Sequence, residues 1–340
     1  MTDYFVLLTR DSSTQFYITQ GSSDVAGVLP DSTHLEADFR LVGHLLHAAR
    51  NMSMSSALTV VRGSDTDILI ILLAYLPEVL QFNPHHTILY DCGTGNSRYM
   101  LNINTIGQYI GLERCRGLLF LHAFSGCDYT PSFYNVGKLK FFDLYFVNKD
   151  IHTDEVFKAL SSAPRTVTQE QFDTVVKFTL AAYQIKGAVI EDLPTARIQG
   201  ILSPLIDSFR SLPPTESALY HVTLRATYVA GHLWGQAATF APDLPLFEEW
   251  GWDPLSDLEQ QNPNSVIRPI WTTNVDLLGT AYSNLSKVSN CGDKNSCLNK
   301  NCSCRNTKCL PTCKCRGECK KDLAHSIVQD ESDNYDTDED

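Results

Sequence analysis

Long apolar runs are missing from this 340-residue chain, and their absence argues against one class of protein. A helix that spans a bilayer needs about 20 predominantly apolar residues. The run Ile68–Leu76 is far shorter and follows directly on an acidic pair. The first residues also lack the basic stretch and the small-residue cleavage site of a secretory leader. We therefore expect a protein without a membrane span that stays in a reducing, intracellular compartment.

Positive charge is scarce as well, since 27 Lys and Arg face 39 Asp and Glu, for a formal net charge of −12. This balance argues against a protein that binds nucleic acid through its overall charge. Two segments depart from the average in opposite directions. Residues 287–321 carry nine Lys or Arg against two acids, whereas residues 330–340 carry seven acids and no base. The acidic stretch is predicted to be a disordered tail that either keeps the protein soluble or competes with nucleic acid for the basic segment.

Cysteine is rare along most of the chain, but eight of the eleven cysteines lie between Cys291 and Cys319. In a reducing compartment, thiolates packed this closely bind Zn²⁺, because so short a segment has too little apolar surface to fold alone. A disulfide framework would need an oxidising compartment, which nothing else in the sequence supports. Cys92, Cys115 and Cys127 lie too far away to join and are predicted to be buried hydrophobic side chains. The predicted zinc ligands are Cys291, Cys297, Cys302, Cys304, Cys309, Cys313, Cys315 and Cys319.

Within this cysteine segment, the Cys-x-Cys pairs Cys302/Cys304 and Cys313/Cys315 resemble half of a tesmin-type CXC domain. Members of that family hold a compact multi-zinc cluster and bind DNA, so the resemblance implies a nuclear protein with a nucleic-acid partner, DNA in preference to RNA. Asp293 stands where the family has the second cysteine of its first pair. It either ligates zinc through oxygen or costs the site an ion. The family's short aromatic reading segment has no clear counterpart in this chain.

Acidic residues stand next to apolar segments at three places. Residues 35–38 read Leu-Glu-Ala-Asp ahead of a helical pattern, and residues 57–67 read ALTVVRGSDTD, an apolar strand that ends in two carboxylates. A third acid, Asp128, follows an apolar run in the stretch HAFSGCDYTPSFYNVGKLK, residues 122–140. In an α/β layer, acids at the carboxyl end of a strand and in the first turn of a helix meet at one edge of the sheet. Divalent hard cations prefer such oxygen ligands.

These three motifs resemble, in order and spacing, the Glu-Ala-(Glu/Asp), Asp-x-Asp and Gly-(Ser/Cys)-Asp-Tyr elements of the flap-endonuclease/XPG branch of the PIN-like nucleases. The resemblance implies an α/β fold with a partial PIN-like parallel sheet and metal-dependent hydrolysis of phosphodiesters. Two Mg²⁺ or Mn²⁺ ions can stabilise both the attacking water and the leaving oxygen in such a reaction. The segments between residue 150 and the cysteines also resemble the C-terminal part of uncharacterised animal proteins that carry the same Gly-Cys-Asp and Asp-Thr-Asp motifs and are often associated with mobile-element-like genes. The metal ligands that the resemblance implies are Glu36, Asp38, Asp65, Asp67 and Asp128.

The loop Tyr134-Asn135-Val136-Gly137 precedes a second predicted helix. In the resembling nucleases a helix-hairpin-helix with a Gly-hydrophobic-Gly turn holds the duplex, and here the first of those glycines is Asn135. Asn tolerates positive φ, and amides at a helix start bind phosphate oxygens. Nearby lysines would add a non-specific electrostatic attraction to the backbone. The predicted nucleic-acid contacts are Asn135, Gly137, Lys138 and Lys140.

Simpler interpretations of these motifs stay open. Asp65 and Asp67 are also what would cap the helix that follows them. Residues 122–140 also fit an ordinary surface helix-turn-helix with Asp128 as its N-cap. The resembling nucleases carry a further Asp on their opening strand, whereas the strand predicted at Tyr4–Thr9 offers Asp3 and Asp11 without a convincing match. The chain is therefore either a fragment of a longer nuclease or a catalytically inactive relative that binds DNA or acts as a scaffold. A third possibility is a zinc-dependent protein-interaction module on an inert core.

The rest of the sequence predicts mainly helices. Apolar periodicity covers residues 154–184 and 197–240 and includes an amphipathic helix over Thr215–Thr239. Residues 86–103, HTILYD turning at GTGN into RYMLNI, predict a hairpin, not the glycine-rich loop of a methyltransferase. The tryptophans around residues 250–252 and 271 are predicted to fasten the chain to the core and not to stack on bases.

These segments suggest four parts. Residues 1–150 form the nuclease-like layer with the helix-hairpin-helix, and residues 151–285 a helical extension with an aromatic linker that includes a boundary region at Asn262–Ser265. Residues 286–322 form the zinc module and residues 323–340 the acidic tail. The oligomeric state is left undetermined by the sequence.

Overall fold

The computed structural model describes about two thirds of the chain and divides it into two units. The first unit comprises residues 1–182 and 219–271, and the second comprises residues 183–218 and 272–340. The predicted division after residue 150 falls inside the first unit, between two helices. The predicted zinc module and acidic tail lie outside the described residues, as does the boundary region at Asn262–Ser265. The described residues are 3–7, 17–20, 23–24, 37–51, 57–147, 150–183, 192–202, 211–254 and 267–271.

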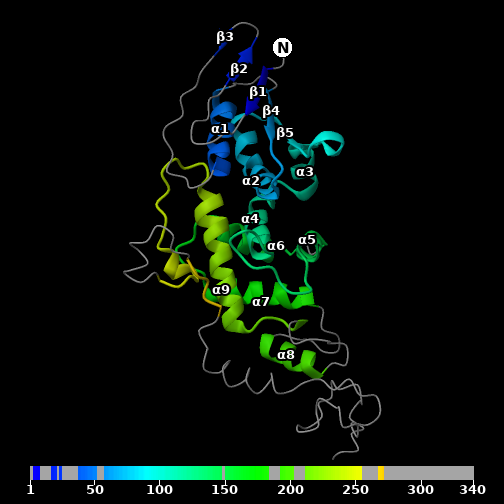
Figure 1. The fold of residues 1–340 in the computed structure, drawn as a ribbon, viewed down its shortest axis with the longest axis vertical. Coiled ribbons are helices and arrows are strands. Elements are labelled where there is room, and N and C mark those ends of the chain that lie inside the picture. Colours follow the sequence, from blue (N-terminus) through cyan, green and yellow to red (C-terminus); the bar gives the residue numbers. More distant parts are fainter. Residues whose placement is uncertain are drawn as a thin grey trace, which may run out of the picture. The chain divides into compact units, whose positions relative to one another are not determined.

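The chain has an α/β fold that is mostly helical, with a small mixed sheet in the order β3-β2-β1-β4-β5-β6 (Figure 1). Its centre is parallel, since β4 pairs in parallel with both β1 and β5. Both edges are antiparallel. The predicted parallel sheet is thus correct for the centre and wrong for the edges. The strands are β1 (Asp3–Leu7), β2 (Tyr17–Gln20), β3 (Ser23–Asp24), β4 (Ala57–Arg62), β5 (Thr87–Cys92) and β6 (Tyr99–Asn102).

The predicted hairpin is confirmed at β5 and β6, whose register places Leu89 opposite Asn102. Its turn uses positive φ at Gly93 and Gly95, which glycine adopts without steric cost. Strand β6 ends where the Asn102 side chain accepts a hydrogen bond from the amide of Thr105 and caps the next helix. A methyltransferase loop would continue into a helix directly after the glycines, so the hairpin excludes that interpretation.

Four helices build the core beside the sheet: α1 (Ala37–Asn51), α2 (Thr66–Phe82), α3 (Ile103–Ile110) and α4 (Leu118–Phe124). The apolar positions predicted to face the core in α1 are all buried: Phe39, Leu41, Val42, Leu45 and Leu46. Helix α2 packs against the other three (Figure 1) and is correspondingly apolar around its circumference. No helix in the described part of the chain has the length and apolar character needed to cross a membrane.

Aromatic side chains join α4 to the helices that follow it. The Phe120 and Phe157 rings lie 4.9 Å apart, and the Phe157 and Phe178 rings lie 5.0 Å apart. Such tilted and edge-on pairs add to the stabilisation from apolar burial. Phe141 extends the cluster from α5, with its ring 5.9 Å from that of Phe178. The helices concerned are α5 (Lys138–Val147), α6 (Ile151–Leu160) and α7 (Gln169–Tyr183); α8 (Leu193–Leu202) belongs to the second unit.

The predicted helix over Thr215–Thr239 begins where expected, with α9 (Glu216–Thr227), but does not stay α-helical. It continues as a π-helical turn, Tyr228–Leu233, and a 3₁₀ turn, Trp234–Gln236. The Tyr75 hydroxyl lies 3.0 and 2.9 Å from the carbonyl oxygens of Trp234 and Gly235. These tertiary partners satisfy carbonyls that a regular helix would use internally. Further 3₁₀ turns lie at Gly95–Ser97, Cys115–Gly117 and Phe247–Trp250.

Candidate carboxylate site

Asp65 and Asp67 lie at the start of α2, just beyond the carboxyl end of β4. Asp65 is the N-cap residue, and its Oδ1 accepts a hydrogen bond of 2.9 Å from the amide of Asp67. The backbone at Asp65 is fixed from the sheet side, because the Tyr90 hydroxyl donates to the Asp65 carbonyl at 2.7 Å. The capping role considered for this pair is therefore confirmed for Asp65. Capping engages one carboxylate oxygen of a side chain that is itself exposed.

Asp67 faces the interior and contacts a buried histidine. Its Oδ1 lies 2.7 Å from Nε2 of His122, a residue of α4 that is only 2% exposed. Because an ionised carboxylate only accepts hydrogen bonds, Nε2 carries the proton. The Lys138 ammonium lies 3.2 Å from Nδ1 and 3.4 Å from Nε2 of the same ring. The three side chains thus form a connected Lys–His–Asp group.

His122 was not among the residues predicted from the sequence. It is the first residue of the stretch that drew attention to Asp128, and histidine next to a carboxylate motif was the available signal. Its ring is held by neighbours on two sides, at 5.6 Å from the Trp234 ring and 6.4 Å from the Phe142 ring. Packing of this kind fixes the orientation in which His122 meets Asp67.

A tight turn presents Asp128 at the same edge. The backbones of Cys127 and Thr130 exchange hydrogen bonds of 3.1 and 3.2 Å, and the Thr130 hydroxyl donates to the carbonyl of Ala123 in α4. Gly126, with φ of 114°, lets the chain leave the helix, and a Cβ there would lie 2.9 Å from Cα of Ser132. Asp128 itself is exposed at the tip of the turn.

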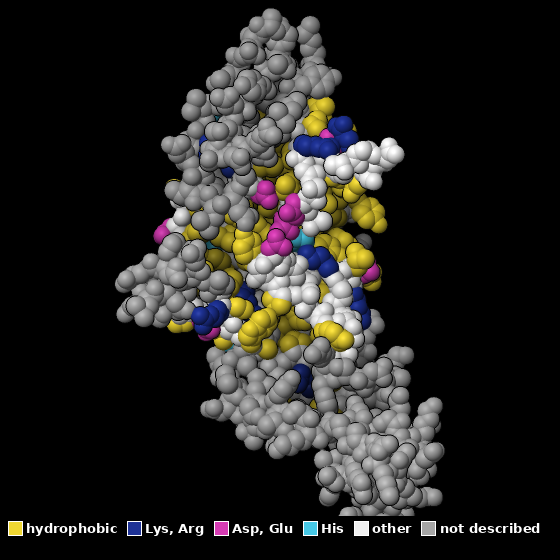
Figure 2. Space-filling model, in the orientation of Figure 1, with side chains coloured by type: hydrophobic (Ala, Val, Ile, Leu, Met, Phe, Trp, Pro, Cys, Tyr) yellow, Lys and Arg dark blue, Asp and Glu magenta, His cyan; other side chains and the backbone are white. Residues whose placement is uncertain are grey.

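Asp65, Asp67 and Asp128 all act electrostatically on Lys138. Burial lowers the pKa of Lys138, and the Cys127 thiol and these three carboxylates act in the opposite direction. Figure 2 shows acidic side chains gathered in the middle of the described surface, beside histidine and a basic side chain. We call Asp65, Asp67, Asp128, His122 and Lys138 the carboxylate site.

The two remaining predicted carboxylates belong to the start of α1. Asp38 is half-buried in the first turn of that helix. Burial is the main cause of the raised pKa of Tyr90, and the charges of Cys92, Asp65 and Asp38 raise it further. The place of Asp38 in a metal-ligand set stays a prediction. Glu36 lies outside the described residues.

The described carboxylates do not by themselves form a metal-ligand set. Among the described residues, no three His, Cys, Asp or Glu side chains converge closely enough to hold one ion. The positive charge among the acids is instead the ammonium of Lys138. The cysteines of the predicted zinc module lie outside the described residues. Of the three others, Cys92 and Cys115 are buried as predicted and Cys127 is half-buried; burial raises the pKa of Cys115 to about 12.

The loop predicted to contact nucleic acid leads into helix α5, and its nucleic-acid contacts stay a prediction. Asn135 has φ of 57°, which fits its place at a position where the resembling nucleases have glycine. Helix α5 begins at Lys138, as predicted. The ammonium of Lys138 contacts His122. Lys140, two residues further along the helix, is half-buried. Gly137 has open space where a Cβ would lie.

Comparisons of the chain with family profiles, curated proteins and solved structures find no match. The nuclease and CXC resemblances therefore stay predictions from the sequence motifs. In the structure, Asp67 contacts the buried His122, and Asp65, Asp67 and Asp128 act on the charge of Lys138. Acids from two distant segments, 65–67 and 128, thus interact with one lysine.

Proposed function

We propose that this chain is a nucleic-acid-directed protein of nuclease ancestry whose carboxylate site does not cut phosphodiesters, and whose segment 286–322 holds DNA as a zinc module. The observation that carries the first part is the position of Lys138. The Lys138 ammonium contacts His122, which in turn contacts Asp67. The charges of Asp65 and Asp128 also act on this ammonium. A side-chain cation thus stands among the carboxylates that the resembling nucleases use for metal.

An ammonium at this position opposes the binding of a divalent ion in two ways. Like charges about 4 Å apart repel by roughly 4 kcal/mol at the effective dielectric constant near a protein surface. In addition, Oδ1 of Asp67 is engaged by the buried His122 ring at 2.7 Å. A metal that took this oxygen would leave a buried N–H without a partner, at a cost of about 1–3 kcal/mol. Charge compensation by Lys138 is therefore the more stable state of the site.

The DNA-binding part of the proposal is supported by composition. Residues 287–321 combine eight cysteines with nine Lys or Arg in a chain that is otherwise acidic. Zinc would fold the segment, and its basic side chains would then release counterions from the DNA backbone on binding. Such binding is expected to weaken steeply as salt is raised.

A second candidate function is metal-dependent phosphodiester hydrolysis. It is favoured by the convergence of Asp65 and Asp67, at the start of α2, with Asp128 on a turn some sixty positions later in the sequence. Hydrolysis by this edge would require Lys138 to move aside and further oxygen ligands, for which Glu36 and Asp38 are the candidates from the resemblance.

The two functions separate in a binding and cleavage experiment on the purified full chain. Flap DNA is incubated with Mg²⁺ or Mn²⁺, and Mn²⁺ affinity is measured by calorimetry for the natural sequence and for Lys138→Met. We expect no cutting by the natural sequence, and at least a tenfold gain in Mn²⁺ affinity in Lys138→Met, because about 1.4 kcal/mol of repulsion corresponds to that factor. Lys140→Met is the matched control and should leave Mn²⁺ affinity unchanged.

Robust cutting by the natural chain that disappears in Asp65→Asn would contradict the proposal and establish the second candidate. The module is tested separately by metal analysis of the same preparation. At least two zinc ions per chain are expected, with loss of DNA binding after chelation. A chain that contains fewer than two zincs, or that binds DNA equally well after chelation, would remove the module from the proposal.

A further inference from the structure

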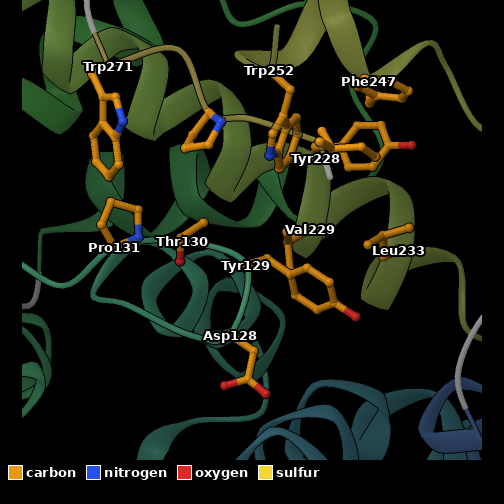
Figure 3. Close-up of a pocket in the computed structure, with 12 residues that line it drawn as sticks. Asp128, Tyr129, Thr130, Pro131, Tyr228, Val229, Leu233, Phe247, Trp252 and Trp271 are labelled. Atoms are coloured by element: carbon orange, nitrogen blue, oxygen red, sulfur yellow. The ribbon is translucent and has the colours of Figure 1, made fainter. Parts of the chain in front are cut away.

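An open cleft of about 830 Å³ lies next to the carboxylate site, within the first unit (Figure 3). One wall is the turn that carries Asp128, together with Pro131, and the opposite wall carries Trp252 and Trp271. The π-helical turn after α9 closes one end. A volume of this size is within the range of cavities that hold organic ligands. We call it the aromatic cleft.

Aromatic rings dominate the lining of the aromatic cleft. Five of its side chains are aromatic: Tyr129, Tyr228, Phe247, Trp252 and Trp271. Tyr228 and Trp252 meet edge to face, with ring centroids 5.3 Å apart and an interplanar angle of 74°, so that they form a corner. Trp271 is 61% exposed and presents its ring across the cleft from Pro131. The sequence-based expectation that the tryptophans fasten the chain to the core is confirmed for Trp250, which is buried. Trp271 is exposed, but its ring also contacts the core, because the buried Arg225 guanidinium lies 5.7 Å from its centroid.

The charge around the aromatic cleft is negative. Asp128 is the one charged side chain among its described lining residues, and Figure 3 shows its carboxylate at the mouth, directed away from the rings. Asp65 and Asp67 add further negative charge beyond this mouth. The positive charges nearby are the ammonium of Lys138 and the buried guanidinium of Arg225, whose Cζ lies 5.7 Å from the centroid of the Trp271 ring. A second carboxylate, Glu248, follows the lining residue Phe247 in the sequence, and its charge adds to burial in raising the pKa of Tyr228.

Glu248 also has a buried acceptor atom, Oε2, that lacks a hydrogen-bond partner among the described residues. Burying a carboxylate oxygen without a partner is costly, and a cation nearby would reduce the cost. Negative charge thus borders the same set of aromatic rings at the mouth, through Asp128, and near Tyr228, through Glu248.

We propose that the aromatic cleft binds an organic ammonium ion, an alkylated amine or a lysine-type side chain with an apolar stem. Ring faces attract such cations through their quadrupole, most strongly when the site is partly desolvated. The stem would lie along the apolar walls. The ammonium would lie against the corner formed by Tyr228 and Trp252, toward the Asp128 mouth, because the Arg225 guanidinium already contacts the Trp271 ring. A nucleotide would also find ring faces for its base, but it would bring a phosphate next to Asp128, Asp65 and Asp67, where like charges repel. This inference does not depend on the proposed function.

The test is a titration of the full chain followed by tryptophan fluorescence and calorimetry. The probes are trimethyllysine amide, its uncharged carbon isostere, and adenosine monophosphate. We expect the cation to bind at least about tenfold more tightly than the isostere, as attraction by two or more rings and a carboxylate would give. Equal affinity for the isostere would show a merely apolar cleft and overturn the proposal. Tighter binding of adenosine monophosphate would overturn it in favour of base stacking.

Two substitutions locate the site, each with a matched control. Asp128→Asn removes the charge at the mouth and should weaken cation binding at least about threefold. Asp243→Asn, which replaces another exposed acid, is the control and should leave cation binding unchanged. Trp252→Leu keeps an apolar wall but removes a ring face and should weaken the cation more than the isostere. Tyr109→Leu, at a ring that is 93% exposed and outside the cleft, should change neither affinity. Unchanged cation binding in both Asp128→Asn and Trp252→Leu would refute the assignment to this cleft.

Discussion

The N-cap of helix α2 allows the structural and chemical roles of Asp65 to be separated. Oδ1 of Asp65 accepts the amide of Asp67 at 2.9 Å, and one such capping bond contributes about 1 kcal/mol. The carboxylate adds an interaction with the helix dipole of about 0.3–1 kcal/mol, at the low end here because Asp65 is exposed. Asp65→Ala removes both contributions. Asp65→Asn removes only the charge, because Asn caps helices as well as Asp does.

We therefore expect Asp65→Ala to lower the free energy of unfolding by roughly 1–1.5 kcal/mol and Asp65→Asn by less than about 0.5 kcal/mol. The measurement is urea denaturation followed by far-UV circular dichroism, with equal m-values required for the comparison. Ser64→Ala, at the exposed neighbouring position, is the control and should have no measurable effect.

Equal losses in Asp65→Ala and Asp65→Asn would refute this reasoning, because the amide would then have failed to replace the cap. No loss in Asp65→Ala would refute it as well, since the capping bond would contribute nothing. If the expected order is found, Asp65→Asn becomes the appropriate variant for cleavage and metal experiments. Any change it causes there would report on charge, at nearly constant stability.

Two further predictions concern stability. Gly231→Ala should lower the free energy of unfolding by about 1–3 kcal/mol, because a Cβ there would lie 2.8 Å from the Leu160 carbonyl oxygen, whereas Gly137→Ala, in open space, should be neutral in the same urea titration. Burial holds the pKa of His86 at about 4, below its usual 6.5, so the unfolded chain takes up the proton first as pH falls. The contribution of neutral His86 to the free energy of unfolding should therefore be fully present above pH 6.5 and should decline as the pH falls toward 4. His86→Gln should make this decline smaller, whereas His85→Gln should leave it unchanged. An identical pH dependence in both variants would contradict the prediction.

Much of the local structure could be predicted because it is encoded within a few neighbouring residues. The apolar spacing of α1, the hairpin of β5 and β6, and the start of α9 after two prolines follow from periodicity, turn chemistry and backbone restriction. The same holds for Asp65, whose position before an apolar helix predicts a cap. Positive φ at Asn135 likewise fits a property of its own side chain.

Tertiary structure decided how these pieces meet. His122 and Asp67 are 55 positions apart in the sequence, and their contact depends on the packing of α4 against α2. Lys138 was expected to face a nucleic acid, and only the approach of α5 to α4 turns it toward the carboxylates. The aromatic cleft combines residues near 130 with residues near 250 and 270. No local sequence pattern encodes these long-range contacts. Side chains far apart in the sequence are brought together only when whole helices bury their apolar faces against each other.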